Sequence, residues 1–167
     1  MIDFNAKHKL KFDSSKQNIF FTADTHLGHE NIIKYCNRPF ASIEEHDEEI
    51  IKRWNEKIGP DDIVFHLGDF AFASESYIKY VLEQLNGKKY LIFGNHDWKR
   101  MTKSICQKYF VDVSQQMVIR IDNQLIYLNH FPFLCFAGSW RGLDAAWQIF
   151  GHVHSGPLSA DGLDHER

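Results

Sequence analysis

Residues 89–98 read KYLIFGNHDW, and this stretch decides the fold. An apolar, β-prone run stops at Gly94, and Asn95, His96 and Asp97 follow with no spacer. The apolar run predicts a buried strand. A turn has no reason to prefer His over Gly, Asn or Ser. The stretch therefore predicts a strand that carries metal- or proton-binding side chains at its carboxyl end.

The same arrangement recurs elsewhere in the chain. Further strands are predicted over Asn18–Ala23, Asp62–Leu67 and Ala146–Phe150, and a hairpin over Met117–Asp122 and Gln124–Asn129. In open α/β sheets, ligands lie beyond the carboxyl ends of the strands. We therefore expect the polar side chains at these ends to meet. In chain order they are Asp24, His26, Asp69, Asn95, His96, His130, His152 and His154.

Predicted helices separate the first strands. A capping-box pattern at Ser42 opens one helix, and Gly59-Pro60 ends it. A second helix is predicted from about Ser74 to Asn86, and a third over Trp98–Gln107. This β-α-β-α-β order implies parallel strands with right-handed crossovers, followed by a mixed or second sheet. The predicted fold class is a layered α/β domain.

Composition narrows the function classes. A chain of 167 residues is expected to form a single domain, residues 1–167, and its net charge of −3 does not favour nucleic acid as a partner. Its three cysteines form no C-x-x-C pair, which is typical of a reducing cytoplasm. There is no signal-peptide core and no apolar run of about 20 residues, so no membrane association is expected.

Two divalent ions would explain the polar set. Asp24, His26 and His154 can serve one ion, whereas Asn95, His130 and His152 can serve the other, and Asp69 can bridge both. Imidazole and carboxylate ligands without thiolate suit Mn, Fe, Zn, Ni or Co, and disfavour Mg and Ca. Two such ions outweigh the two carboxylates in charge, and the remainder can attract an anion such as a phosphate.

The motifs D-x-H, G-D, G-N-H-D, a lone His and G-H-x-H, in this order from Asp24 to His154, resemble the calcineurin-like metallophosphoesterase superfamily. Residues 24–40 are similar to a small bacterial and phage phosphoesterase subgroup. The resemblance implies a four-layer α/β/β/α sandwich with a dinuclear metal centre. Members usually continue into a further strand, so the chain, which ends at Arg167, is expected either to be a compact version or to lack a C-terminal strand.

The resemblance also implies a mechanism. Phosphoesters would be hydrolysed by a hydroxide that bridges the two metals. His96 would be the catalytic residue that stabilises the scissile phosphate or protonates the leaving oxygen. Asp97 would orient His96 or hold the loop, and the alternative interpretation is a helix N-cap.

Candidate substrate contacts are less sharply defined. His29 could contact the substrate phosphate, or could have a supporting or surface role. Arg38 could clamp a phosphate oxygen, and Arg141 could recognise a further phosphate, although surface charge explains either one. The polar segment 44–49 is interpreted as a solvated helix face. His66 is interpreted as a buried histidine with its hydrogen bonds satisfied.

The substrate class follows in part from what is missing. Residues 68–73 lack the Asp-Arg pair of the protein phosphatases in the superfamily, and the chain has no length for the additional domains of its large nucleases. A small phosphoester or nucleotide remains, with a phosphodiester favoured over a phosphomonoester. The alternative is a non-catalytic protein-interaction scaffold on the same fold, which would be marked by loss of His96 or of several ligands. This chain retains them.

Overall fold

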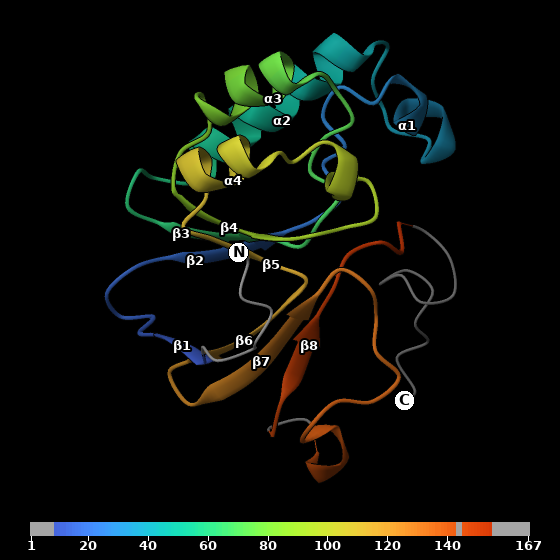
Figure 1. Ribbon diagram of the computed structural model, residues 1–167. Coiled ribbons are helices and arrows are strands. Elements are labelled where there is room, and N and C mark those ends of the chain that lie inside the picture. The colour runs from blue at the N-terminus through green and yellow to red at the C-terminus, as the bar shows by residue number, and fades with distance from the viewer. Residues whose placement is uncertain (1–8, 143–144, 155–167) are drawn as a thin grey trace.

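The computed structural model describes residues 9–142 and 145–154 and contains two four-stranded sheets (Figure 1). The strands are β1 (Lys9–Phe12), β2 (Ile19–Thr22), β3 (Ile63–His66), β4 (Lys88–Ile92), β5 (Asp112–Ser114), β6 (Gln116–Ile121), β7 (Gln124–Asn129) and β8 (Trp147–Ile149). The helices are α1 (Glu30–Tyr35), α2 (Ile43–Lys57), α3 (Glu75–Leu82) and α4 (Lys103–Tyr109), with 3-10 turns η1 (Asp97–Lys99) and η2 (Ser139–Arg141).

The first sheet has the order β2-β3-β4-β5, and all of its strands are parallel, as predicted. Its helices begin at side-chain caps. Ser42 accepts a hydrogen bond from the backbone N–H of Glu45, and Ser74 accepts one from that of Tyr77. Because the strands are parallel, the carboxyl ends of β2, β3 and β4 all reach the same edge of the sheet.

Two predicted helices differ from the observed ones. α3 ends at Leu82, short of the predicted Asn86. The helix predicted from Trp98 begins only at Lys103, where Thr102 accepts a hydrogen bond from the N–H of Ile105. The predicted start was wrong because a second cap, at Thr102, begins the helix.

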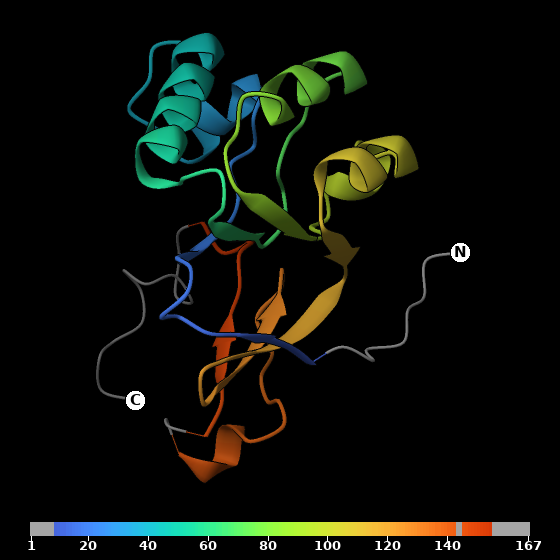
Figure 2. The ribbon, with the colours of Figure 1, turned by 90° about the vertical axis from the view of Figure 1, so that its left-hand side faces the viewer.

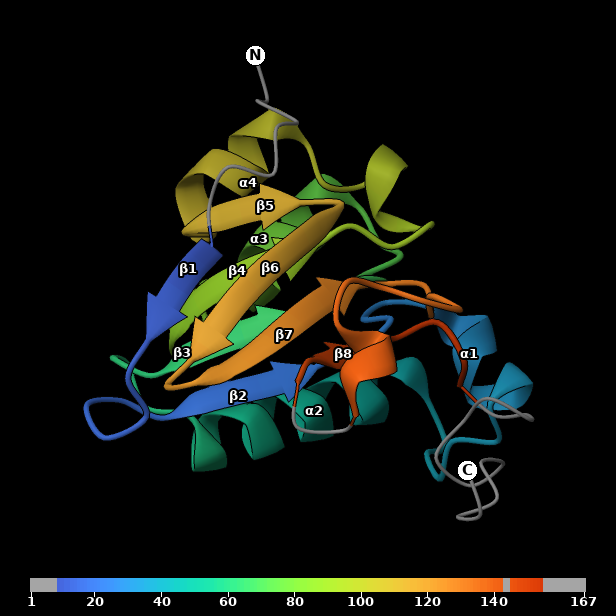
Figure 3. The ribbon, with the colours of Figure 1, turned by 90° about the horizontal axis from the view of Figure 1, so that it is seen from below.

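The second sheet has the order β1-β6-β7-β8. β6 and β7 form the predicted antiparallel hairpin, and β8 pairs in parallel with β7. β1 pairs in parallel with β6. Three elements were not predicted from the sequence, namely β1, β5 and α1. Figure 3 shows that β2 and β7 end on the same side of the molecule, near α1. The two sheets therefore deliver strand ends to one place.

Two hydrophobic clusters hold the layers together. One lies between the helices and the first sheet, and the other lies between the two sheets. Figure 2 shows this order, with the helices above the first sheet and the second sheet below it. The α/β class is confirmed. The expected fourth layer is a helical layer outside the second sheet, and among the described residues only η2, beside β8, lies there. No helix among the described residues is long and apolar enough to cross a membrane.

Phe65 on β3 is central to the packing between the sheets. It is fully buried, and its ring centroid lies 5.4 Å from that of Phe12, 5.4 Å from that of Phe21 and 4.8 Å from that of Tyr90. We expect Phe65→Ala to lower the free energy of unfolding by about 3–5 kcal/mol in urea titrations, because it leaves a cavity between the sheets. Val111→Ala, at an exposed position, should change it by less than about 0.5 kcal/mol. Equal effects of the two changes would contradict this prediction.

Candidate metal centre

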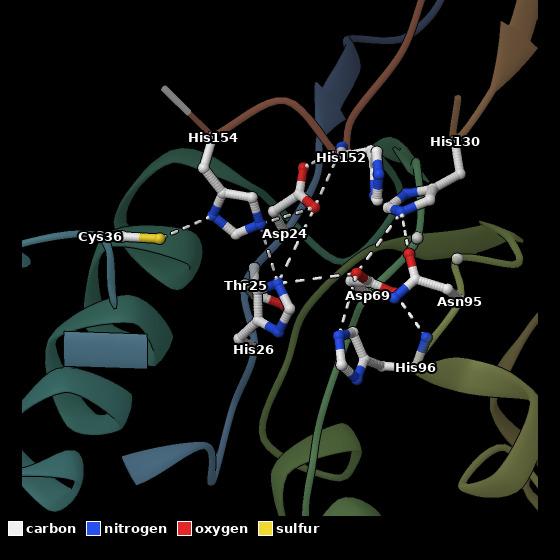
Figure 4. Close-up of polar contacts among 12 residues, drawn as sticks. Asp24, Thr25, His26, Cys36, Asp69, Asn95, His96, His130, His152 and His154 are labelled. Atoms are coloured by element: carbon white, nitrogen blue, oxygen red, sulfur yellow. Dashed lines mark hydrogen bonds and ion pairs between the residues drawn. The ribbon is translucent and has the colours of Figure 1, made fainter. Parts of the chain in front are cut away.

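Five strand ends meet at one edge of the sandwich. Loops after β2, β3 and β4 approach from the first sheet, and loops after β7 and β8 approach from the second. Figure 4 shows the side chains from these loops turned toward a common centre. The structure thus brings together all eight residues expected from the sequence, namely Asp24, His26, Asp69, Asn95, His96, His130, His152 and His154.

One group of potential ligands comprises Asp24, His26 and His154, whose ligand atoms all lie within 4.8 Å of one another. The Nε2 atoms of the two histidines are 3.1 Å apart. Oδ1 of Asp24 lies 3.4 Å from Nε2 of His154 and 3.9 Å from Nε2 of His26. One cation could take ligands from all three side chains.

A second group comprises Asp69, His130 and His152, with the same spacing limit of 4.8 Å. Nδ1 of His130 donates to the carbonyl oxygen of Leu67 at 2.7 Å, which leaves Nε2 to face the site. This Nε2 atom lies 3.3 Å from Oδ1 of Asn95. Asn95 is thereby placed beside the group to which it was assigned from the sequence.

Asp69 lies between the two groups. Its Oδ2 atom is 3.7 Å from Nε2 of His26, 3.4 Å from Nε2 of His130 and 3.9 Å from Nε2 of His96. Its Oδ1 atom accepts the backbone N–H of His96 at 2.9 Å. A carboxylate in this position could bridge two ions. His26, Asp69 and His96 form a third group with the same spacing, so the division of ligands between two ions stays a prediction.

The backbone of the site is strained. Asp24, His26, Asp69 and His152 have φ values of 54°, 49°, 53° and 69°, in the left-handed region that residues other than glycine rarely adopt. Each such residue costs on the order of 1–3 kcal/mol and persists only where its surroundings hold it. Four strained residues among the potential ligands indicate that the fold is built around their side-chain directions.

Asp97 holds two of the ligand loops together. It is fully buried and accepts the backbone N–H groups of Asp69 at 2.8 Å, Phe70 at 3.0 Å and Gly94 at 2.8 Å. Burial raises the pKa of Asp97 to about 6, although these N–H groups oppose the shift. Of the two interpretations of Asp97, loop anchoring is therefore correct, and the helix N-cap is wrong.

Most of the protonation states suit metal binding. The exception is His130, because burial lowers its pKa but the hydrogen bond with Asp69 outweighs burial and raises it. Burial lowers the pKa of His26 to about 3 and also lowers that of His152. Burial disfavours ionisation of Asp69, but hydrogen bonds from His130 and from the N–H of His96 outweigh it and lower the pKa to about 2. Neutral imidazole and ionised carboxylate are the forms that coordinate metals. The donor set therefore fits divalent transition-metal ions.

The predicted solvated face of α2 is wrong at two positions. His46 and Asp47 are almost completely buried. They face the loop after β2, where Asp47 accepts the N–H of Gly28 at 2.7 Å. The sequence spacing indicated this burial. His46 and Asp47 lie three or four positions from Ile43 and Ile50, and so share the apolar helix face that also carries Trp54.

The three candidate substrate contacts have different positions. The ring centroid of His29 lies 5.4 Å from that of His26 and 5.9 Å from that of His96, so His29 belongs to the site. The guanidinium of Arg38 instead turns inward to backbone carbonyl groups. Arg141 lies in η2, which precedes β8, whereas the site lies beyond the end of β8. The structure therefore does not bring Arg141 to the site.

Three further residues lie beside the site. Cys36 and Phe72 were missed in the sequence, whereas Phe131 was not, because the loop 131–140 joins two of the predicted strands and was expected to pass close to the site. Sγ of Cys36 lies 3.1 Å from Nδ1 of His154 (Figure 4). The ring centroid of Phe72 lies 5.5 Å from that of His96, and that of Phe131 lies 4.6 Å from that of His152. Nothing local marks Cys36 and Phe72, because their positions depend on how distant loops pack.

Comparisons with known proteins agree with this architecture. A family model described as calcineurin-like phosphoesterase matches residues 17–144. An uncharacterised protein of Methanocaldococcus jannaschii is 36% identical over 146 residues, which cover 86% of this chain and 73% of that protein. The gene 66 protein of Mycobacterium phage L5 is 32% identical over 162 residues, which cover 83% of this chain and 78% of that protein.

A solved structure is also similar. A protein of unknown function from Aquifex aeolicus matches with a TM-score of 0.58 and 30% identity. The match covers 68% of this chain and 60% of that protein, so the chain spans less than two thirds of the Aquifex protein. The names of these relatives give no substrate.

A substitution at Gly94 tests the position of the Asp69 carboxylate. A Cβ atom at this position would lie 2.2 Å from Oδ1 and 2.5 Å from the backbone N of Asp69. We expect Gly94→Ala to displace Asp69 and to weaken the binding of Mn²⁺ or Zn²⁺ by about tenfold or more in calorimetric titrations. In the control Gly59→Ala, the nearest atom would be Oδ2 of Asp62 at 3.3 Å, and metal affinity should not change. Unchanged affinity in Gly94→Ala would contradict the placement of Asp69.

His66 gives a prediction about pH. It is buried beneath the site and has satisfied hydrogen bonds, as predicted: Nε2 pairs with Oγ1 of Thr25 at 2.9 Å, and Nδ1 accepts the N–H of Gly68 at 3.3 Å. Burial lowers its pKa from 6.5 to about 4. Because the folded-state pKa is the lower one, protonation favours unfolding. The stability contributed by neutral His66 should be complete above about pH 6.5 and lost as the pH falls through about 4.

The measurement is an NMR titration of the imidazole nitrogens, in which the signals of His66 should stay constant down to about pH 5. A titration midpoint near 6.5 would contradict the prediction.

Proposed function

Because the chain belongs to the calcineurin-like phosphoesterase family, we propose that it is a hydrolase of small phosphoesters that uses two divalent transition-metal ions. The observation that carries the proposal is the position of Asp69, whose carboxylate lies between two ligand groups. Asp24, His26 and His154 would hold one ion, and the second group together with Asn95 would hold the other. Mn, Fe, Zn and Ni all suit these ligands.

The bound ions would acidify a water molecule and neutralise charge on the phosphate oxygens. The chain's own residues would do the rest. His96 has 34% of its side chain exposed, so a substrate can reach it. Asp69 accepts its backbone N–H and fixes the start of its loop. In this position His96 could donate a proton to the oxygen of the leaving group.

Features around the site favour a phosphodiester or a small nucleotide. Asn95, His152 and His154 are exposed, so the site is open enough for a phosphate that carries groups on two sides. Beside His96, the rings of His29 and Phe72 lie 4.7 Å apart and provide an apolar surface for an organic group. A net charge of −3 does not favour a long nucleic acid.

The test uses metal-stripped protein refilled with Mn²⁺, Zn²⁺, Ni²⁺ or Mg²⁺, and compares a p-nitrophenyl phosphodiester with the matching monoester. We expect transition metals to restore diester hydrolysis. His96→Ala should lower kcat by about 10²–10⁴-fold while two ions stay bound. Asn95→Ala should instead weaken metal binding. Lys52→Ala, on the exposed face of α2, serves as the control and should match the unchanged protein.

The other outcomes are equally informative. A preference for the monoester would correct the substrate class and leave the hydrolase in place. Two bound ions without turnover on either substrate, with any of the metals, would contradict the enzyme and leave the scaffold alternative. Full activity in His96→Ala would show that another group protonates the leaving oxygen.

A further inference from the structure

A buried polar network lies behind the loop that carries Asp24 and His26. We call it the anchor network and define it as Arg38, His46, Asp47 and Tyr77. It joins the segment after α1 to helices α2 and α3. Its members contact the backbone of residues 24–28 and none of the potential metal-binding atoms.

Arg38 holds the start of the loop. Its Nη2 atom donates to the carbonyl oxygen of Asp24 at 2.6 Å, and its Nη1 atom donates to that of Thr25 at 2.9 Å. Two successive carbonyl groups thus point back to one guanidinium. The planar fork of arginine suits this pair, whereas lysine has a single compact ammonium. Without Arg38, both part-buried carbonyl groups would lose a charged donor.

Asp47 holds the end of the loop. Its Oδ2 atom accepts the N–H of Gly28 at 2.7 Å and the hydroxyl of Tyr77 at 2.6 Å. Burial and the bond to Asp47 raise the pKa of Tyr77 well above its usual value, so the phenol stays a donor.

His46 connects Asp47 to Arg38. An arginine can only donate, so Nε2 of His46 accepts from Arg38 and Nδ1 donates to Oδ1 of Asp47 at 2.7 Å. The network is therefore continuous and satisfied from one end of the loop to the other.

The segment between these two anchors is strained. Asp24 and His26 have φ values of 54° and 49°, in the left-handed region that residues other than glycine rarely adopt. Such backbone persists only where the surroundings hold it. The second ligand group depends on other supports, namely Asp97 and the carbonyl of Leu67. The anchor network thus acts directly on one ligand group. It reaches the other only indirectly, because Asp24 accepts the N–H of His152 and the N–H of His26 donates to the carbonyl oxygen of Asp69.

We propose that Arg38 and Asp47 are positioning residues that hold Asp24 and His26 in ligating geometry before an ion binds. The affinity of one ion position would then depend on residues that contact neither ion, and the other position would depend on them much less. The inference rests on the two-ion site of the proposed function. It also replaces the expectation that Arg38 clamps the substrate.

The test is a calorimetric Mn²⁺ titration of the metal-stripped full chain, with the melting temperature measured in parallel. The unchanged protein should bind two ions. Arg38→Gln and Asp47→Asn should weaken one of them by about 10–100-fold and weaken the other much less. Arg38→Lys should restore only part of the affinity. Arg53→Gln, which removes an exposed arginine that pairs with Glu49 on α2, should bind like the unchanged protein.

Double variants identify the ion position that is affected. His154→Ala removes a ligand from the same group, so adding Arg38→Gln should cost little more. Asn95→Ala acts on the other group, so adding Arg38→Gln should cost the full amount. Affinities equal to those of the unchanged protein in both Arg38→Gln and Asp47→Asn would overturn the inference, as would equal weakening of both ions. Failure of the unchanged protein to bind two ions would instead overturn the proposed function. If Arg38→Gln does not fold, Arg38→Lys and Asp47→Asn still decide the outcome.

Discussion

The position of one carboxylate, that of Asp69, constrains most of the site. A carboxylate between two ligand groups must be fixed in place while its oxygen atoms stay accessible. In this chain the fixing contacts are made mainly by the backbone of Asp69. The N–H of Asp69 is bound by Asp97, its carbonyl accepts the N–H of His26, and the missing side chain of Gly94 leaves room for its oxygens. A change in the contacts of Asp97 or Gly94 with Asp69 would displace the one carboxylate that lies between the two ligand groups.

The loop after β2 depends on the loop after β3. Besides the bond from His26 to Asp69, the N–H of Leu27 donates to the carbonyl of Phe70, and the N–H of Phe72 donates back to the carbonyl of Leu27. The two loops therefore continue the parallel pairing of their strands, with an isolated bridge between Leu27 and Ala71. The anchor network supports this arrangement from behind, and a buried network is effective because its groups are all satisfied.

The sequence predicted the strand ends well because the signal is local. Ligand-type residues follow apolar runs directly, as at Asn95 and His130, and parallel strands must present such ends at one edge. Features set by distant contacts were missed or wrong. The charged neighbours of Asp47 concealed its place on the buried stripe of α2. β1 and β5 have four and three residues, which is too short for a clear period. The inward turn of Arg38 depends on carbonyl groups that only the folded loop exposes.

The ligands come from both sheets, and this has a mechanical consequence. Asp24, Asp69 and Asn95 follow strands of the first sheet, whereas His130 and His154 follow strands of the second. Between the sheets lies a hydrophobic cluster, which resists separation but has little directional preference against sliding. An ion bound by ligands from both sheets would cross-link the two sheets at one end of the sandwich. The spacing of the ligands would then report any slip of one sheet over the other.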